Sequence, residues 1–171
     1  MNLDEEERRD KDAVELSLKK YQRGIKFLFT KYAYSTGKNV AGASFNQYQK
    51  IFEVISLADL LKMCREVDLV GYITKEELSN LVKKLNMRFG DKSEFNSLDF
   101  EGFNMLIVNL AFLCFSKEPK DLRSKGISFM IDELFKFVAE SQRKKGQSGA
   151  IFDEFGAENM IPGISDPVQM K

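Results

Sequence analysis

The sequence contains no histidine among its 171 residues. Histidine is the usual general base near neutral pH and the commonest metal ligand, so its absence removes both roles. The sequence also has no Walker A loop, no Gly-x-Ser-x-Gly and no Cys-x-x-Cys. The acidic run Asp4–Asp12 is interpreted as a solvated face rather than as acid–base pairs. We therefore expect a protein that is not an enzyme and that uses no cofactor.

An excess of charge of either sign is also missing, because 26 basic residues balance 26 acidic ones. A general nucleic-acid binder needs a basic surface that displaces counterions from phosphates, so we expect no nucleic-acid partner. A balance over the whole chain leaves room for a local basic patch. The first twelve residues are mostly charged and do not resemble a signal peptide, which predicts a cytoplasmic protein.

Long apolar runs and cysteines are scarce. The most apolar stretch, residues 98–115, is too short for a bilayer and contains Glu101, Asn104 and Asn109, so we expect no membrane association. Cys64 and Cys114 are the two cysteines, and both lie in apolar helical patterns. This placement is typical of reduced core thiols in a cytosolic protein.

Hydrophobic residues make up 43% of the chain and recur at helical spacing, which predicts an all-α domain. We expect a charged arm at residues 1–12, either a helix extension or a flexible arm, a helical domain at 13–145 and an extended tail at 146–171. Residues 98–115 are apolar nearly all round, as is typical of a helix at the centre of a domain. The first helix should bury a face made of Leu18, Tyr21, Ile25, Leu28, Phe29 and Tyr32.

Capping residues predict where the other helices begin. Ser44 with Gln47 and Thr74 with Glu77 have the spacing of a capping box, and Asp99 is a favourable N-cap. An apolar stripe that follows Ser44 runs to Ile55, and a second stripe, residues 57–67, either continues that helix or follows a bend near Ser56. A last helix should open at Pro119, run to Lys145 and end at Gly146.

Three segments share one layout, an apolar residue followed by a capping residue and a helix: Ala43–Tyr48, Ile73–Leu78 and Leu98–Phe103. This layout resembles the second half of an EF-hand loop. It implies paired degenerate EF-hand-like helix–loop–helix units with an extra C-terminal helix. The first unit would span residues 13–55, and the second would join the Thr74 helix to the Leu98 helix.

The middle loop permits two registers. A loop from Glu66 to Glu77 has carboxylates at its first, third and twelfth positions, the third being Asp68, but Val70 stands at the fifth. A loop that begins at Asp68 fits the helix pattern better and is two residues too short to wrap an ion. We favour the short, metal-free turn.

The other two loops also lack a full set of charged oxygens. In a loop from Asp91 to Gly102, oxygens come from Asp91, Ser93 and Asp99, but Gly102 stands where a bidentate carboxylate is required. The first loop contains no carboxylate. We therefore expect no metal site, and the candidates if calcium binds are Asp91, Ser93, Asp99, Glu66, Asp68 and Glu77.

The runs FLFTKYA, VGYITKEELSNLVKKL and SLDFEGFNMLIVNLAFLCF carry a resemblance to a known family. They are similar to the tubulin-polymerization-promoting protein family and to EF-hand-like modules of ciliary proteins, over residues 25–118. The resemblance implies microtubule association without catalysis. It differs near residues 51–61, where this chain has extra residues, and in the C-terminal part.

The expected function is therefore that of a structural component of a cytoskeletal assembly, associated with microtubules in the axoneme of cilia, with tubulin or axonemal proteins as partners. The tail is either a flexible terminus or a segment that docks in a groove on a partner or on its own domain. Its candidate docking residues are Phe152, Phe155, Met160 and Ile161. Two alternatives stay open: a calcium-responsive module that uses the Asp91–Gly102 or Glu66–Glu77 loop, and an adaptor subunit of another large complex.

Overall fold

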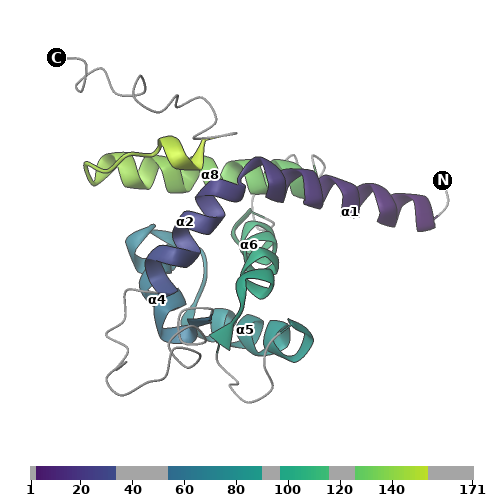
Figure 1. Cartoon of the computed structure of the whole chain (residues 1–171), viewed down its shortest axis with the longest axis horizontal. Helices are drawn as coiled ribbons and strands as arrows, with labels where there is room; N and C mark the ends of the chain where they lie inside the picture. The colour runs from purple at the N-terminus through teal and green to yellow at the C-terminus, as the bar shows by residue number, and fades with distance from the viewer. Residues whose placement is uncertain (1–2, 34–53, 90–96, 116–125, 154–171) are drawn as a thin grey trace, which may run out of the picture.

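The computed structural model describes residues 3–33, 54–89, 97–115 and 126–153, and these are mostly helical, which confirms the all-α class (Figure 1). The elements in chain order are α1 (Leu3–Lys20), α2 (Gln22–Ala33), β1 (Ile55–Ser56), α4 (Leu57–Glu66), the 3-10 turn η1 (Leu69–Gly71), α5 (Lys75–Phe89), β2 (Ser97–Leu98), α6 (Phe100–Phe115), α8 (Ile127–Lys144) and the 3-10 turn η2 (Ala150–Phe152).

The N-terminal arm is a helix extension. Helix α1 begins at Leu3, and its first half projects away from the rest of the molecule in Figure 1. The chain bends at Tyr21, where α1 ends and α2 begins. The predicted apolar face is buried apart from Leu18, which is half-buried. The predicted buried face is therefore confirmed, but it is shared between α1 and α2 instead of belonging to a single helix.

Two short strands pair with each other and connect the segment before α4 to the segment before α6. Strand β1 pairs antiparallel with β2, with Ile55 opposite Leu98 and Ser56 opposite Ser97. Each strand runs directly into a helix, α4 or α6. We call α2, β1 and α4 the first unit and α5, β2 and α6 the second unit.

The start of α4 corrects one prediction and confirms another. Ile55 lies in a strand, so the prediction of a helix from Ser44 through Ile55 is wrong at its end. The bend near Ser56 is confirmed, because Ser56 caps α4 and forms a reciprocal capping box with Asp59. The first unit therefore continues to Glu66 instead of ending at Ile55. The predicted box of Ser44 and Gln47 lies outside the described residues.

A tight turn connects the two units. Asp68 adopts the left-handed conformation (φ 63°), η1 follows, and α5 begins after Thr74. The predicted Thr74–Glu77 capping box is confirmed, since Thr74 N–H donates to Glu77 Oε2 (3.0 Å) and Glu77 N–H donates to Thr74 Oγ1 (3.1 Å). The short turn favoured from the sequence is the one observed.

Helix α6 lies at the centre, as the sequence predicts. It packs on α8, α5 and α2, and Phe29 of α2 contacts the rings of Phe100 and Phe103. Eight of its residues are buried. Phe112 is the exception among its large apolar residues, because 45% of it is exposed.

The last long helix begins later than predicted. Helix α8 starts at Ile127, because Gly126 has φ 87° and is not helical, so the prediction of a single helix from Pro119 to Lys145 is wrong. Pro119 itself lies outside the described residues. The predicted end is confirmed: α8 stops at Lys144, and Gly146 follows with φ 74°.

The first residues of the tail fold back onto the domain. Turn η2 packs against α2 and α8, and the Arg143 guanidinium binds the Asp153 carboxylate at 3.0 Å. Gly24 makes this approach possible, because a Cβ there would lie 3.0 Å from the Ile151 carbonyl oxygen and from the Phe152 ring. The predicted extended tail is therefore docked as far as Asp153.

Candidate functional site: a basic helix face and an interhelical groove

The described metal-ligand candidates in the second unit serve as helix caps. Asp99 Oδ1 accepts a hydrogen bond of 2.7 Å from Gly102 N–H at the start of α6, and Glu77 completes the box at the start of α5. Asp91 and Ser93 lie outside the described residues.

The candidates at the end of α4 bind neighbouring elements. Glu66 Oε2 accepts a hydrogen bond of 2.5 Å from the Tyr32 hydroxyl. Asp68 accepts one from the Ser141 hydroxyl (2.5 Å) and pairs with Lys145 (3.2 Å). These contacts, with Ser141 first, hold the pKa of Asp68 below its usual value. Within the described part of the chain, no three Asp, Glu, Cys or His residues gather around one point.

Asp59 is a buried carboxylate that the sequence reasoning missed. Its Oδ2 accepts from the Ser56 N–H (2.9 Å) and from the Ser56 hydroxyl (2.7 Å). Its Oδ1 is buried and has no hydrogen-bond partner within the described residues. The signal was the spacing of Ser56 and Asp59, which matches that of Ser44 and Gln47 twelve residues earlier. In the first unit, Asp59 stands three residues after the cap, as Gly102 does in the second.

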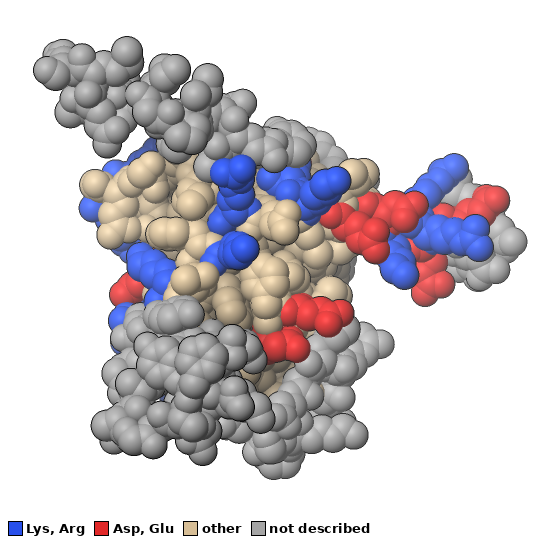
Figure 2. Space-filling model, in the orientation of Figure 1, with Lys and Arg blue, Asp and Glu red and all other residues tan. Residues whose placement is uncertain are grey.

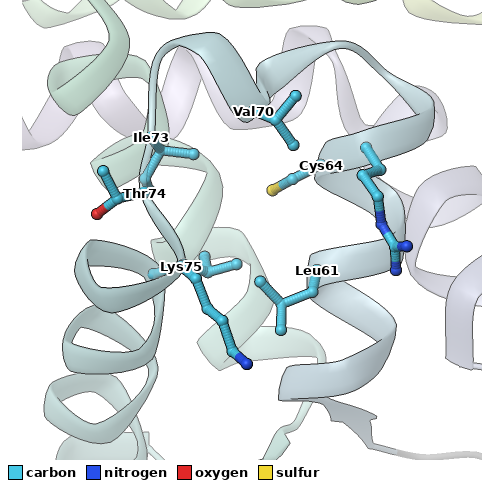
Figure 3. A pocket seen from close by; sticks show the side chains of 8 residues that line it. Leu61, Cys64, Val70, Ile73, Thr74 and Lys75 are labelled. Atoms are coloured by element: carbon cyan, nitrogen blue, oxygen red, sulfur yellow. The ribbon is translucent and has the colours of Figure 1, made fainter.

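A groove of about 360 Å³ separates α4 from α5 (Figure 3). Leu61 and Cys64 of α4 point into it, Val70 and Ile73 close one end, and Lys75 lies across from Leu61. Its charged lining residues are Arg65 and Lys75, both basic.

The chemistry of this groove is that of an apolar surface. Cys64 is only 2% exposed, and burial raises the pKa of its thiol to about 12. The thiolate is the nucleophilic form of cysteine, so Cys64 is not activated. Both cysteines are buried, as expected from their apolar surroundings.

The outer face of α2 is basic. Gln22, Arg23, Lys26, Phe27 and Thr30 are exposed, and their spacing places Arg23, Lys26, Phe27 and Thr30 on one side of the helix. Figure 2 shows Lys and Arg side chains gathered over α2 and the end of α1 that joins it. We call the surface formed by Arg23, Lys26, Phe27, Thr30 and Lys31 the α2 face.

An aromatic ring lies within the α2 face. Phe27 is 40% exposed, and the Lys31 ammonium lies 5.9 Å from its ring centroid. The rings of Phe27 and of Phe152 in η2 meet in an edge-to-face contact, with the centroids 5.8 Å apart. Aromatic and arginine side chains together are enriched at protein–protein interfaces.

Of the four docking candidates of the tail, the structure describes only Phe152. Phe152 is 1% exposed and belongs to the core of its own domain. Of a flexible terminus, docking on a partner and docking on its own domain, the last describes this residue. Phe155, Met160 and Ile161 lie outside the described residues.

The α2 face has a sequence signal that is visible in hindsight. Residues 16–52 contain seven basic residues and no acidic residue. At the chain's average frequency of 26 acidic residues in 171, a stretch of this length would carry about six. The balanced net charge of the whole chain concealed this segregation.

Comparisons of the chain with models of known protein families, with curated proteins and with solved structures find no match. In the part of the chain that the structure describes, no helix combines the length and apolarity that a membrane crossing requires.

Proposed function

We propose that this chain is a non-catalytic interaction protein of a cytoskeletal assembly, and that it binds microtubules through a domain of two EF-hand-like units. The observation that carries this proposal is the antiparallel pairing of Ile55 with Leu98, each directly before a helix cap. In an EF-hand pair, the apolar residue of each loop pairs with its counterpart in the partner loop. The resemblance of residues 25–118 to microtubule-associated proteins adds the partner class.

The described carboxylates support a scaffold role over an ion-binding one. Asp59 and Asp99 cap helices, Glu66 binds Tyr32, and Asp68 binds Ser141 and Lys145. The first two stabilise the starts of α4 and α6, and the contacts of Glu66 and Asp68 stabilise the packing between elements. A domain held in this way presents a fixed surface, which suits a protein that docks in an assembly.

Co-sedimentation with purified microtubules tests the proposal directly. The full chain should pellet with microtubules in a saturable manner and should stay in the supernatant without them. In ciliated cells, it should fractionate with the axoneme. A chain that remains soluble in both experiments would refute the microtubule proposal.

The two other functions have their own tests. Calorimetric titration with calcium should give no heat of binding at low-micromolar concentrations, and a clear isotherm there would favour the calcium-responsive module. If microtubules fail to bind, affinity purification of the full chain followed by mass spectrometry would test the adaptor function by identifying another complex.

A further inference from the structure

The cations of the α2 face differ from the other basic residues near them. Lys20 pairs with Asp132 (3.1 Å), Arg143 with Asp153 (3.0 Å) and Lys145 with Asp68 (3.2 Å). Within the described residues, the side chains of Arg23 and Lys26 make no hydrogen bond or ion pair. They stand three residues apart on one helix, where like charges repel each other. A partner of negative charge would relieve that repulsion.

The surroundings of the α2 face restrict the kind of partner. The inner side of α2, which contains Ile25, Leu28 and Phe29, is committed to the core, so a single aromatic ring remains exposed. A helix that lies in a membrane interface needs a broad apolar face, which α2 does not offer. This leaves an anionic partner in water.

The charge of α1 disfavours a nucleic acid. Residues 3–12 carry six acidic and three basic side chains, and they lie in the first half of α1, the helix that joins α2 at Tyr21. A polyanion that extended along α2 towards α1 would meet this acidic excess. A short acidic protein segment that ends at the α2 face would not meet this acidic excess.

We propose that the α2 face binds an acidic segment of a partner protein, with carboxylates placed on Arg23 and Lys26 and an apolar side chain placed on Phe27. The three cations with one exposed aromatic ring carry this assignment. It rests on the proposed function in so far as it names the surface and the partner chemistry that the assembly would use.

The test measures binding of the full chain to two fluorescent probe peptides, one glutamate-rich with phenylalanines and one glutamate-rich without them. The double variant R23E/K26E should weaken binding of the first peptide at least about tenfold, because both charge contacts become repulsive. Phe27→Ala should reduce the preference for the peptide that contains phenylalanine. Binding should also weaken as salt is raised.

The matched control is K83E/K84E, which makes the same change of charge on two exposed residues of α5. It should bind the peptides as the wild-type chain does. Far-UV circular dichroism of both double variants should match the wild type, because all four side chains are exposed. Equal loss of binding in the two variants would mean that only net charge matters and would overturn the proposal.

Other occupants of the α2 face give distinct results. Suppose that the wild type binds single-stranded RNA or phosphatidylserine vesicles, that R23E/K26E loses this binding, and that neither peptide binds. This result would overturn the assignment of the α2 face to a protein partner. A full chain with Glu154→Gln, Glu158→Gln and Asp166→Asn tests its own tail. If this neutralised chain binds the peptide at least tenfold more tightly than the wild type, the tail is the occupant and the proposal fails.

The microtubule experiment separates this inference from the proposed function. If the wild type and R23E/K26E pellet equally with microtubules, the proposed function stands and the α2 face is refuted. If the wild type does not pellet but binds the peptide through Arg23 and Lys26, the surface stands and the microtubule partner is refuted.

Discussion

The two units pair through their strands but cap their second helices in opposite ways. In the first unit, Ser56 is the cap and the carboxylate comes three residues later, at Asp59. In the second unit, Asp99 is the cap and Gly102 stands three residues later. A Cβ at Gly102 would lie 3.2 Å from Asp99 Oδ1, so the glycine leaves room for the cap. The equivalent helix starts of the two units, those of α4 and α6, are therefore stabilised by two different residue patterns.

The entering helices of the two units also differ. In the second unit, Asn86 Nδ2 of α5 donates to the Ser97 carbonyl oxygen (2.6 Å) in the buried interior. In the first unit, Tyr32 of α2 reaches across to Glu66 of α4, which is only half-buried. The polar link of the second unit is therefore more deeply buried than that of the first.

The largest expected effect tests whether the two units share one core. Leu106 of α6 and Leu60 of α4 are both fully buried. Replacing either by alanine should cost about 2–5 kcal/mol, through lost burial and the cavity left behind. Urea unfolding followed by circular dichroism should show a single transition at lower urea for both variants.

The control for this pair is Phe112→Ala, in the same helix as Leu106 but 45% exposed. It should cost less than the buried leucines. Two separate transitions in Leu60→Ala would show that the units unfold independently and would contradict the shared core.

The next effect compares the two polar links. Asn86→Ala should cost about 1–3 kcal/mol, because the Ser97 carbonyl loses a buried donor. Tyr32→Phe should cost less, since water can reach Glu66 after the hydroxyl is removed. The free energies of unfolding of both variants, measured side by side, check this order. A larger loss in Tyr32→Phe would mean that the first unit is the more rigidly joined of the two.

The caps are expected to contribute less. Asp59→Ala should destabilise by about 1–2 kcal/mol, and Asp99→Ala by about 1 kcal/mol, because the first change removes a reciprocal box and the second a single bond. Thermal and urea unfolding of both variants measure the difference. If Asp59→Ala raised stability instead, the burial of its unpaired Oδ1 would outweigh its bonds to Ser56.

The smallest effect concerns the link between the units. The folded-state pKa of Asp68 lies below its unfolded value because of the Ser141 hydrogen bond and Lys145. Its contribution to stability is therefore present above about pH 3.9, the ordinary pKa of aspartate, and is lost as pH falls through the folded pKa. Asn also tolerates the left-handed conformation, so Asp68→Asn isolates the charge.

The measurement is the difference in free energy of unfolding between wild type and Asp68→Asn as a function of pH. The wild type should be the more stable near neutral pH, and the two curves should converge in acid. Because the Asp68 side chain is 51% exposed, salt should reduce the difference. Curves that stay parallel down to strong acid would mean that the charge of Asp68 is not what stabilises the turn.

Much of the local structure could be predicted from the sequence. The buried sides of α1, α2 and α6, the capping box at Thr74 and the cap at Asp99 all depend on residues within one or two turns of each other. The capping box of Ser56 and Asp59 was not predicted, although its spacing is the same as that of the predicted pair Ser44 and Gln47. The choice of Ile55 as a strand residue depends on Leu98, which lies 43 positions away.

The candidate site was harder to predict. The basic stretch that includes α2 is present in the sequence, but the net charge of the whole chain is zero and does not reveal it. The docking of Phe152 required Gly24, and nothing local in either segment indicates that they meet.

The sequence by itself determined the helical class, the apolar faces, two of the caps and the central place of α6, because periodicity and capping act over short distances along the chain. Only the tertiary structure decided that β1 pairs with β2, that α8 begins after Gly126, and that η2 covers Gly24 while the α2 face stays exposed. These outcomes depend on which distant surfaces bury each other, and that is set by the packing of the whole domain.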